Sequence, residues 1–167
     1  MIRIERAEID RADEAYAIVQ EYYDAVDVMV REDAGEFAHE YFDLGAGIWL
    51  ATEGEAVVGC IALRKLERFE KSGEVKRLYV KREYRGRGIA EQLLAALEDY
   101  SREAGYRTLY LDSKDDLTTA IRFYQRHGYA ECERYNENPQ ATVFMRKKLT
   151  PSLRSGRAVQ AHTSRQT

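Results

Sequence analysis

A short basic segment offers the clearest chemistry in this chain. Two arginines alternate with two glycines over 85–88, after a predicted strand over 74–80 and before residues with helical spacing. Glycines let a backbone wrap closely around an anion, and a helix start presents unpaired N–H groups and the positive end of the helix dipole. The segment therefore predicts a cradle for a pyrophosphate group.

Three nucleotide-binding patterns compete for this segment. A Walker A loop needs G-x-x-x-x-G-K-S/T, which does not occur in the chain. A Rossmann fingerprint needs G-x-G-x-x-G, but Glu91 stands at its last glycine position. The hexapeptide 85–90 instead fits Q/R-x-x-G-x-G/A in full and follows a predicted strand. A purely structural alternative is a basic, solvated turn before a helix.

The spacing of apolar residues predicts the elements that hold this segment in place. Asp10 or Asp13 could cap the first helix, Gly54 within 53–55 suggests a hairpin turn, and Gly105 could end the third helix. This order predicts an α/β (α+β) fold in a single domain, with one mixed, mostly antiparallel sheet and helices on both faces. The expected strands are 2–9, 48–52, 56–64, 74–80, 108–112, 129–135 and 142–149, and the expected helices are 14–26, 31–43, 89–104 and 116–126.

Length and charge exclude some classes of protein. The 167 residues suit one domain, which we expect over 1–150. The net charge of −3 is uneven, because 151–167 hold three arginines and no acid, so that they carry +3 and residues 1–150 carry −6. An acidic body argues against nucleic-acid binding. We expect 151–167 to be a flexible tail.

Membrane, export and metal-binding signals are not recognisable. No apolar run approaches the roughly 20 residues that span a bilayer, and the N-terminus lacks the apolar region of a signal peptide. Cys60 and Cys132 form no C-x-x-C pair, which argues against a disulfide framework and a zinc site. We therefore expect a cytoplasmic protein without a metal.

Several further segments, taken in order along the chain, help to interpret the basic loop. In chain order these are 58–63, 76–80, the loop 85–90, 111–113 and 120–129, the last of which fits A-x-x-x-Y-x-x-x-G-F/Y. On these segments the chain resembles the GNAT superfamily of N-acetyltransferases over about 2–149. Residues 135–139 are similar to the Y-x-x-N-P loop of a branch that acts on small molecules. One departure is Leu117, where many members carry asparagine.

The resemblance implies that acetyl-coenzyme A is the cofactor. Backbone groups of Leu78 and Val80 would pair with its pantetheine arm, in the manner of an added strand. The amides of the loop and the two arginine side chains would hold its phosphates. The implied cofactor-binding residues are Leu78, Tyr79, Val80, Arg85, Gly86, Arg87, Gly88, Ile89, Ala90, Glu91 and Leu117.

The implied reaction is direct attack of an amine on the thioester, which requires two proton transfers. Glu74 is the first candidate for the base and Asp112 the second. The alternatives are that Glu74 pairs with Lys76 or Arg64 and that Asp112 caps a helix or turn. Tyr124 matches the family tyrosine beside the sulfur and could protonate the thiolate, or it could be a core aromatic.

The acceptor site is implied to lie in 24–47 and 132–140. The candidate substrate-binding residues are Tyr22, Tyr23, Phe42, Tyr135 and Asn138. Acidic residues near the first helix, Asp24, Asp27, Glu32 and Asp33, could attract a cationic amine or could form a solvated face.

Three functions follow from the resemblance. The first is acetylation of a primary amine on a small molecule, the second acetylation of protein N-termini or lysines, and the third acyl-CoA binding without catalysis. Intact Glu74, Tyr124 and loop residues favour an enzyme over the third. Many members of the superfamily are dimers, so a homodimer is a further possibility.

Overall fold

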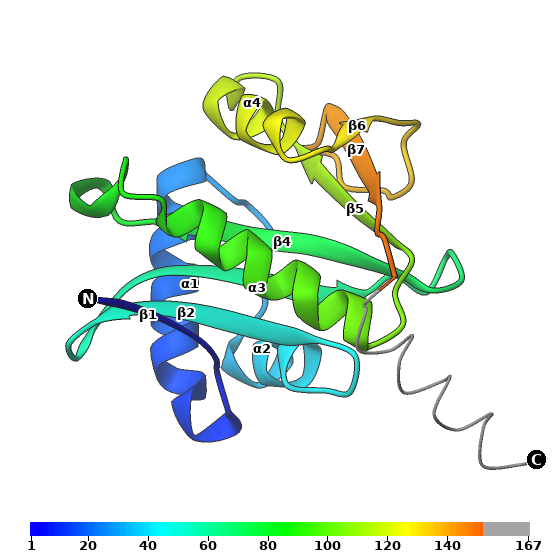
Figure 1. Ribbon diagram of the computed structural model, residues 1–167. Helices are drawn as coiled ribbons and strands as arrows, with labels where there is room; N and C mark the ends of the chain where they lie inside the picture. Colours follow the sequence, from blue (N-terminus) through cyan, green and yellow to red (C-terminus); the bar gives the residue numbers. More distant parts are fainter. Residues whose placement is uncertain (152–167) are drawn as a thin grey trace, which may run out of the picture. The chain divides into compact units, whose positions relative to one another are not determined.

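The computed structural model describes residues 1–151, in which seven strands join in the order β1-β2-β3-β4-β5-β7-β6 (Figure 1). The β4–β5 pair is parallel, and the pairs β1–β2, β2–β3, β5–β7 and β6–β7 are antiparallel. The strands are β1 (Ile2–Arg6), β2 (Gly47–Glu53), β3 (Ala56–Lys65), β4 (Ser72–Val80), β5 (Thr108–Ser113), β6 (Ala130–Glu131) and β7 (Val143–Lys148). The helices are α1 (Ala12–Val26), α2 (Ala34–Tyr41), α3 (Ile89–Glu103) and α4 (Thr118–Arg126), with short 3-10 turns η1 (Ile9–Arg11) and η2 (Arg82–Tyr84).

The predicted mixed sheet and order of elements are confirmed. The chain divides into two compact units, the first comprising Met1–Lys65 and Val75–Tyr100 and the second comprising Leu66–Glu74 and the residues from Ser101 onward. Strand β4 therefore contributes its first three residues to the second unit. The tail predicted over 151–167 lies outside the described residues, apart from Pro151.

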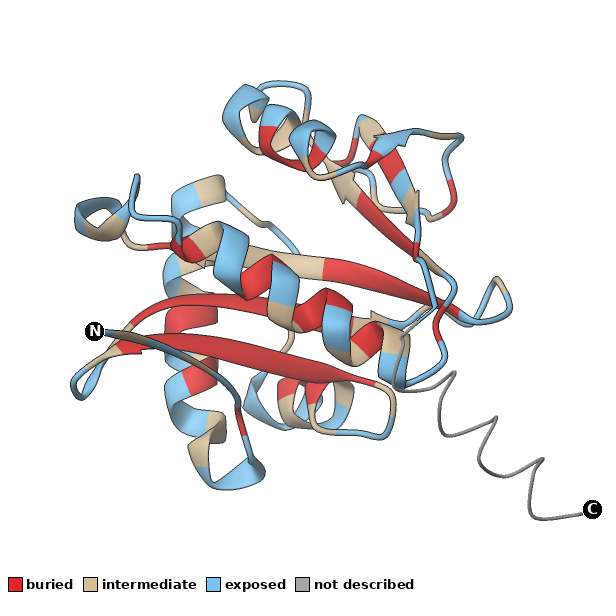
Figure 2. Ribbon diagram, viewed as in Figure 1, coloured by how far each residue is buried: buried red, intermediate tan, exposed pale blue. Residues whose placement is uncertain are grey.

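Helices cover both faces of the sheet in the first unit. Alternate residues of a strand face opposite sides, so Ile48 and Leu50 of β2 join the core cluster with α1 and α2. Trp49 points to the other side, where its ring lies 5.4 Å from that of Tyr100 in α3. Figure 2 shows buried residues running along β2 and β3 and recurring along α3. Both sheet faces of this unit are thus covered, as the sequence predicts.

Strand β3 approaches β4 closely at one glycine. A Cβ on Gly59 would lie 2.9 Å from the Tyr79 carbonyl oxygen and 3.4 Å from a Leu93 methyl. Contacts under 3.0 Å essentially never occur for a real Cβ. Gly59 therefore sets the spacing at which α3 and β4 pack on β3.

The second unit is built around β5. Its register with β7 pairs Asp112 with Phe144, and its parallel register with β4 pairs Glu74 with Tyr110. A buried aromatic cluster lies beside these strands and includes Tyr110, Tyr135 and Phe144. Helix α4 closes with Gly128 at a φ of 93°.

Three local expectations are wrong. Neither Asp10 nor Asp13 caps α1, because η1 runs directly into the helix and Arg11 takes the N-cap position without a side-chain bond. The helix expected over 31–43 is shorter, because Asp33 forms a capping box with Glu36 and the helix begins at Ala34.

The strand expected over 129–135 pairs only at Ala130–Glu131. One more backbone bond to β7 follows, from the Cys132 amide to the Phe144 carbonyl at 2.8 Å, and the loop after it is held by bonds of its own polar side chains. Among the described residues, no helix is long and apolar enough to cross a membrane.

Candidate active site

The predicted phosphate cradle lies in the first unit, between η2 and α3. Gly86 and Gly88 have φ values of 78° and 77°, in the left-handed region that favours glycine. A Cβ on either would meet no atom within 4 Å, so both positions are open. The backbone here therefore takes the conformation in which successive amides can line a concave anion site.

The start of α3 supplies further donors to this cradle. The first helical bond runs from the Gln92 amide to the Gly88 carbonyl at 3.2 Å. The amides before Gln92, those of Ile89, Ala90 and Glu91, thus belong to the first turn, which lacks intrahelical acceptors. The Ile89 side chain is 1% exposed and anchors the turn in the core. The geometry fits the phosphate groups of a coenzyme A.

The two arginines of the loop have partners within the first unit. Arg85 Nε donates to the Val80 carbonyl at 2.9 Å, so this side chain ties the loop to the end of β4. Arg87 Nη2 lies 2.9 Å from Glu53 Oε2, and its guanidinium sits 5.3 Å from the centre of the Tyr84 ring. The Arg87–Glu53 pair is exposed, so its mutual attraction is weak and an anion could compete for the arginine.

A partly buried charged group follows on β4, which we term the arginine cluster (Arg77, Glu32, Tyr23 and Tyr41). Arg77 has a φ of 61°. Its guanidinium lies 4.8 Å from the centre of the Tyr23 ring, and its Nη2 lies 3.7 Å from Glu32 Oε2. The Tyr23 hydroxyl donates to Glu32. Burial raises the pKa of the Tyr23 and Tyr41 phenols, although the nearby Arg77 charge lowers both in part.

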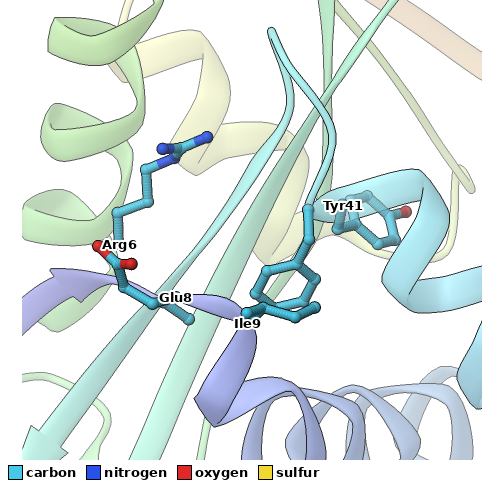
Figure 3. Close-up of a pocket in the computed structure, with 6 residues that line it drawn as sticks. Arg6, Glu8, Ile9 and Tyr41 are labelled. Atoms are coloured by element: carbon cyan, nitrogen blue, oxygen red, sulfur yellow. The ribbon is translucent and has the colours of Figure 1, made fainter.

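The acceptor candidates of the first unit occupy different surroundings. Tyr23 is completely buried in the arginine cluster. Tyr22 packs beside it, with ring centres 5.8 Å from Tyr23 and 6.3 Å from Tyr79. Phe42 instead lines a separate hollow of about 420 Å³. Figure 3 shows Arg6, Glu8, Ile9 and Tyr41 around this hollow, whose lining residues are Arg6, Ala7, Glu8, Ile9, Tyr41 and Phe42.

The second unit brings both predicted bases together. In the parallel register Glu74 lies opposite Tyr110, and Asp112 stands two residues further along β5 on the same face. Glu74 is 0% exposed, whereas Asp112 is half-buried. The ladder between β4 and β5 thus places two carboxylates on one side of the sheet.

The loop after β6 connects these carboxylates. The Tyr135 hydroxyl donates to Glu74 Oε2 at 2.6 Å. Asn136 Nδ2 lies 2.6 Å from Asp112 Oδ2 and 3.3 Å from Glu74 Oε2. Asn138 Nδ2 also reaches Asp112 Oδ2, at 3.3 Å. We term these five residues the carboxylate cluster.

Tyr124 and Leu117 belong to α4 and its start. The Tyr124 ring is 7% exposed and lies 5.4 Å from Phe123 and 5.5 Å from Tyr129, measured between ring centres. Leu117 takes the N-cap position and forms no side-chain capping bond. Its amide donates to the Lys114 carbonyl at 2.9 Å.

Sequence reasoning did not name three members of the two clusters as candidates, which are Asn136, Arg77 and Tyr41. Asn136 lies inside the Y-x-x-N-P segment, and its spacing of two from Asn138 is a signal for consecutive asparagine turns. Arg77 and Tyr41 gave no such signal, since Arg77 meets the loop residue Glu32 and the two tyrosines only in the folded unit. Among residues 1–151, no group of three or more His, Cys, Asp or Glu side chains could hold a metal ion.

Comparisons with known proteins agree with this geometry. The model of the acetyltransferase (GNAT) family matches residues 12–129. An uncharacterized N-acetyltransferase of Schizosaccharomyces pombe is 32% identical over 147 residues, which cover 83% of this chain and 88% of that protein.

Solved structures share the fold. A GNAT acetyltransferase of Staphylococcus aureus superposes with a TM-score of 0.78 at 21% identity, over 90% of this chain and all of that chain. The PaiA N-acetyltransferase of Thermoplasma acidophilum, solved in complex with coenzyme A, gives 0.66 at 18% identity, over 89% of this chain and 99% of that chain. With a family model that covers most of the described residues and a loop shaped for phosphates, the chain belongs to the GNAT family and is an N-acetyltransferase that uses an acyl-coenzyme A.

Proposed function

We propose that this protein acetylates the primary amine of a small molecule, with acetyl-coenzyme A as donor and by direct attack in a ternary complex. The observation that carries the proposal is the carboxylate cluster. Its Asp112 carboxylate accepts from the side-chain amides of Asn136 and Asn138, which are neutral donors. Neutral donors orient a carboxylate without cancelling its charge, so the cluster suits a protonated amine.

The loop between η2 and α3 is the proposed binding site for the phosphates. Acetyl-coenzyme A supplies the acetyl group as a thioester. The amides from Gly86 to Glu91 would bind its phosphates, and Arg87 would add charge once released from Glu53. The backbone of Leu78 to Val80 would pair with the pantetheine arm, and Leu117 would contact it through an apolar side chain.

The residues of the second unit would handle the protons. One carboxylate of the Glu74 and Asp112 pair takes a proton from the ammonium, which frees the nitrogen lone pair. A C–N bond then forms at the acetyl carbon, the C–S bond breaks, and the Tyr124 hydroxyl gives a proton to the departing thiolate, which the second proton lost by the nitrogen replaces. One net proton is released for each amide formed.

The test is thiol release from acetyl-coenzyme A against a panel of amines. The panel holds amino acids, polyamines and other alkylamines, together with peptides that carry free N-termini or lysines. We expect turnover with a small amine to exceed that with every peptide. Preference for a peptide would replace the proposal with protein acetylation, and binding of acetyl-coenzyme A without release for any amine would replace it with a non-catalytic role.

The proposed phosphate site has a matched test. Arg87 and Arg3 each form an exposed ion pair with a glutamate of the first unit, at 2.9 Å and 2.5 Å. We expect Arg87→Glu to weaken coenzyme A binding at least about tenfold by calorimetry, because a charge next to the phosphates is reversed. Arg3→Glu makes the same charge change away from the loop and should leave the affinity unchanged. Equal affinities for the two variants would contradict the assignment.

Tyr124 is tested by removing its hydroxyl alone. We expect Tyr124→Phe to lower kcat by about 10²-fold, the lower end of general acid effects, with little change in affinity for coenzyme A. Unchanged turnover would assign Tyr124 to packing. The homodimer and the cytoplasmic location stay predictions.

A further inference from the structure

The side-chain amide of Asn136 has a defined orientation. Its Oδ1 accepts a bond from the Asn138 backbone N–H at 3.1 Å. A backbone amide can only donate, so the oxygen must face it and the NH₂ group must face the carboxylates. One amide nitrogen thus supplies one N–H to Asp112 and one to Glu74.

Asn138 repeats the arrangement two residues later. Its Oδ1 accepts from the Gln140 backbone N–H at 3.1 Å, which turns its NH₂ group toward Asp112. Such side-chain-to-backbone bonds define consecutive asparagine turns. The loop is built so that two amides converge on one carboxylate.

Two arginines bond to the backbone of the loop that carries the asparagines. Arg134 donates to the carbonyls of Asn136, Asn138 and Ala141 at 3.3, 3.2 and 3.1 Å. Arg68 Nη1 donates to the Tyr135 carbonyl at 2.7 Å. Backbone carbonyls held by two arginines leave the amide side chains little freedom to turn away.

The consequence is an asymmetric Asp112 carboxylate. Both asparagine amides bond to Oδ2, while Oδ1 has no hydrogen-bond partner among residues 1–151. Glu74, in contrast, is completely buried and receives the Tyr135 hydroxyl. Asp112 is half-buried and can therefore meet a ligand with a defined oxygen.

We propose that Asp112 Oδ1 is the atom that takes the proton of the acceptor's ammonium, and that Asn136 and Asn138 are positioning residues that aim it. This inference rests on the proposed amine acetylation and refines it, since Asp112 takes the role for which the sequence favours Glu74. The proton passes from nitrogen to Oδ1, and the freed lone pair forms the C–N bond. Glu74 then acts as a buried neighbour that receives the second N–H of Asn136.

The experiment compares the effect of each variant on two acceptors. One is an alkylamine, which is protonated at neutral pH, and the other is a hydrazide of similar size, which is already neutral and needs no base before attack. We expect Asp112→Asn to lower kcat/KM for the alkylamine about 10²- to 10⁴-fold and to lower that for the hydrazide at least ten times less. Asp116→Asn, an exposed carboxylate on the same connection, is the control and should match the wild type on both acceptors.

The asparagines are tested in the same assay. We expect Asn136→Ala to lower kcat for the alkylamine about tenfold and Asn138→Ala by less, since its bond to Asp112 is longer. The KM for acetyl-coenzyme A should stay near that of the wild type, whereas the lost side-chain bonds should lower the thermal midpoint. Glu137→Gln, which changes the exposed residue between them, should have no effect.

The outcomes separate this inference from the proposed function. If the wild type acetylates no amine, the proposed function fails. If the wild type is active and the loss in Asp112→Asn is equal for both acceptors, Asp112 is not the base. If Glu74→Gln, and not Asp112→Asn, lowers kcat/KM more for the alkylamine than for the hydrazide, the inference is overturned and Glu74 is the base.

Discussion

The arginine cluster of the first unit and the carboxylate cluster of the second each include completely buried side chains, but their charges are handled differently. Arg77 lies against an acid and two phenols, so that a positive charge meets a negative one. Asp112 meets two side-chain amides, which carry no charge. Arg77 is thus paired with a charge of opposite sign, whereas Asp112 is oriented by neutral donors.

The difference shows how burial can serve either stability or binding. An ion pair inside a protein repays the loss of water only when its partner is present, so the arginine cluster belongs to the fold. Carboxylates held by neutral donors are aimed but not neutralised, which is the requirement for a site that receives a cation. The variants below test this division.

The largest effect is expected at Arg77. Replacement by leucine leaves Glu32 buried, with 11% of its side chain exposed and no cation beside it. We expect Arg77→Leu to lower the free energy of unfolding by about 3 kcal/mol, measured by urea denaturation. Adding Glu32→Gln should recover part of this loss, because the stranded charge is then removed. A stable Arg77→Leu protein without activity would break the comparison and place Arg77 in the catalytic site.

The second-largest effect is expected when alkaline pH lowers stability through Cys60, which lies beside the arginine cluster. The Cys60 thiol donates to the Arg77 carbonyl at 3.1 Å, and burial raises its pKa above the ordinary value of 9.0. Below pH 9 both states keep the proton, but above it the unfolded thiol ionises while the folded one does not. Stability should therefore fall by about 1.4 kcal/mol per pH unit from this group.

Urea denaturation between pH 8 and pH 10.5 measures that slope. Cys60→Ala should flatten it, whereas Cys132→Ala should flatten it less, because Cys132 is only half-buried. The same slope in both variants would mean that Cys60 does not carry the effect.

The smallest effect is expected at Tyr135. Tyr135→Phe removes one neutral donor from Glu74 and leaves the others in place. The unfolding free energy should fall by about 1 kcal/mol, the usual contribution of one hydrogen bond. Tyr110→Phe, in the same aromatic cluster, is the control for loss of a hydroxyl. A loss as large as that of Arg77→Leu would show that the two clusters are held together in the same way.

The sequence predicted the backbone conformation of the loop over 85–88 because its signal is local. Two glycines and two arginines between a strand and a helix predict a tightly curved backbone. The structure has both glycines at positive φ. The order of elements could be predicted for a similar reason, since hydrophobic periodicity acts within each segment.

The connections of the carboxylate cluster could not be predicted in this way. Tyr135 and Asn136 lie 61 and 62 residues from Glu74, and only the folded sheet brings them to it. The strand expected over 129–135 failed at the same place, because Asn136 and Asn138 bond their own backbone instead of continuing a ladder. An arginine at positive φ inside a strand, as at Arg77, has no signal in composition.

The open space around Gly86 and Gly88 has a consequence for how this loop tolerates change. A methyl group would fit there, so size does not exclude alanine; handedness does. Natural alanine should cost about 1–2 kcal/mol at each position, whereas its mirror image, introduced by chemical ligation, should fit without strain. Backbone chirality thus limits substitution at these two positions, and a D-residue could carry a reporter group beside the proposed phosphate site without disturbing its amides.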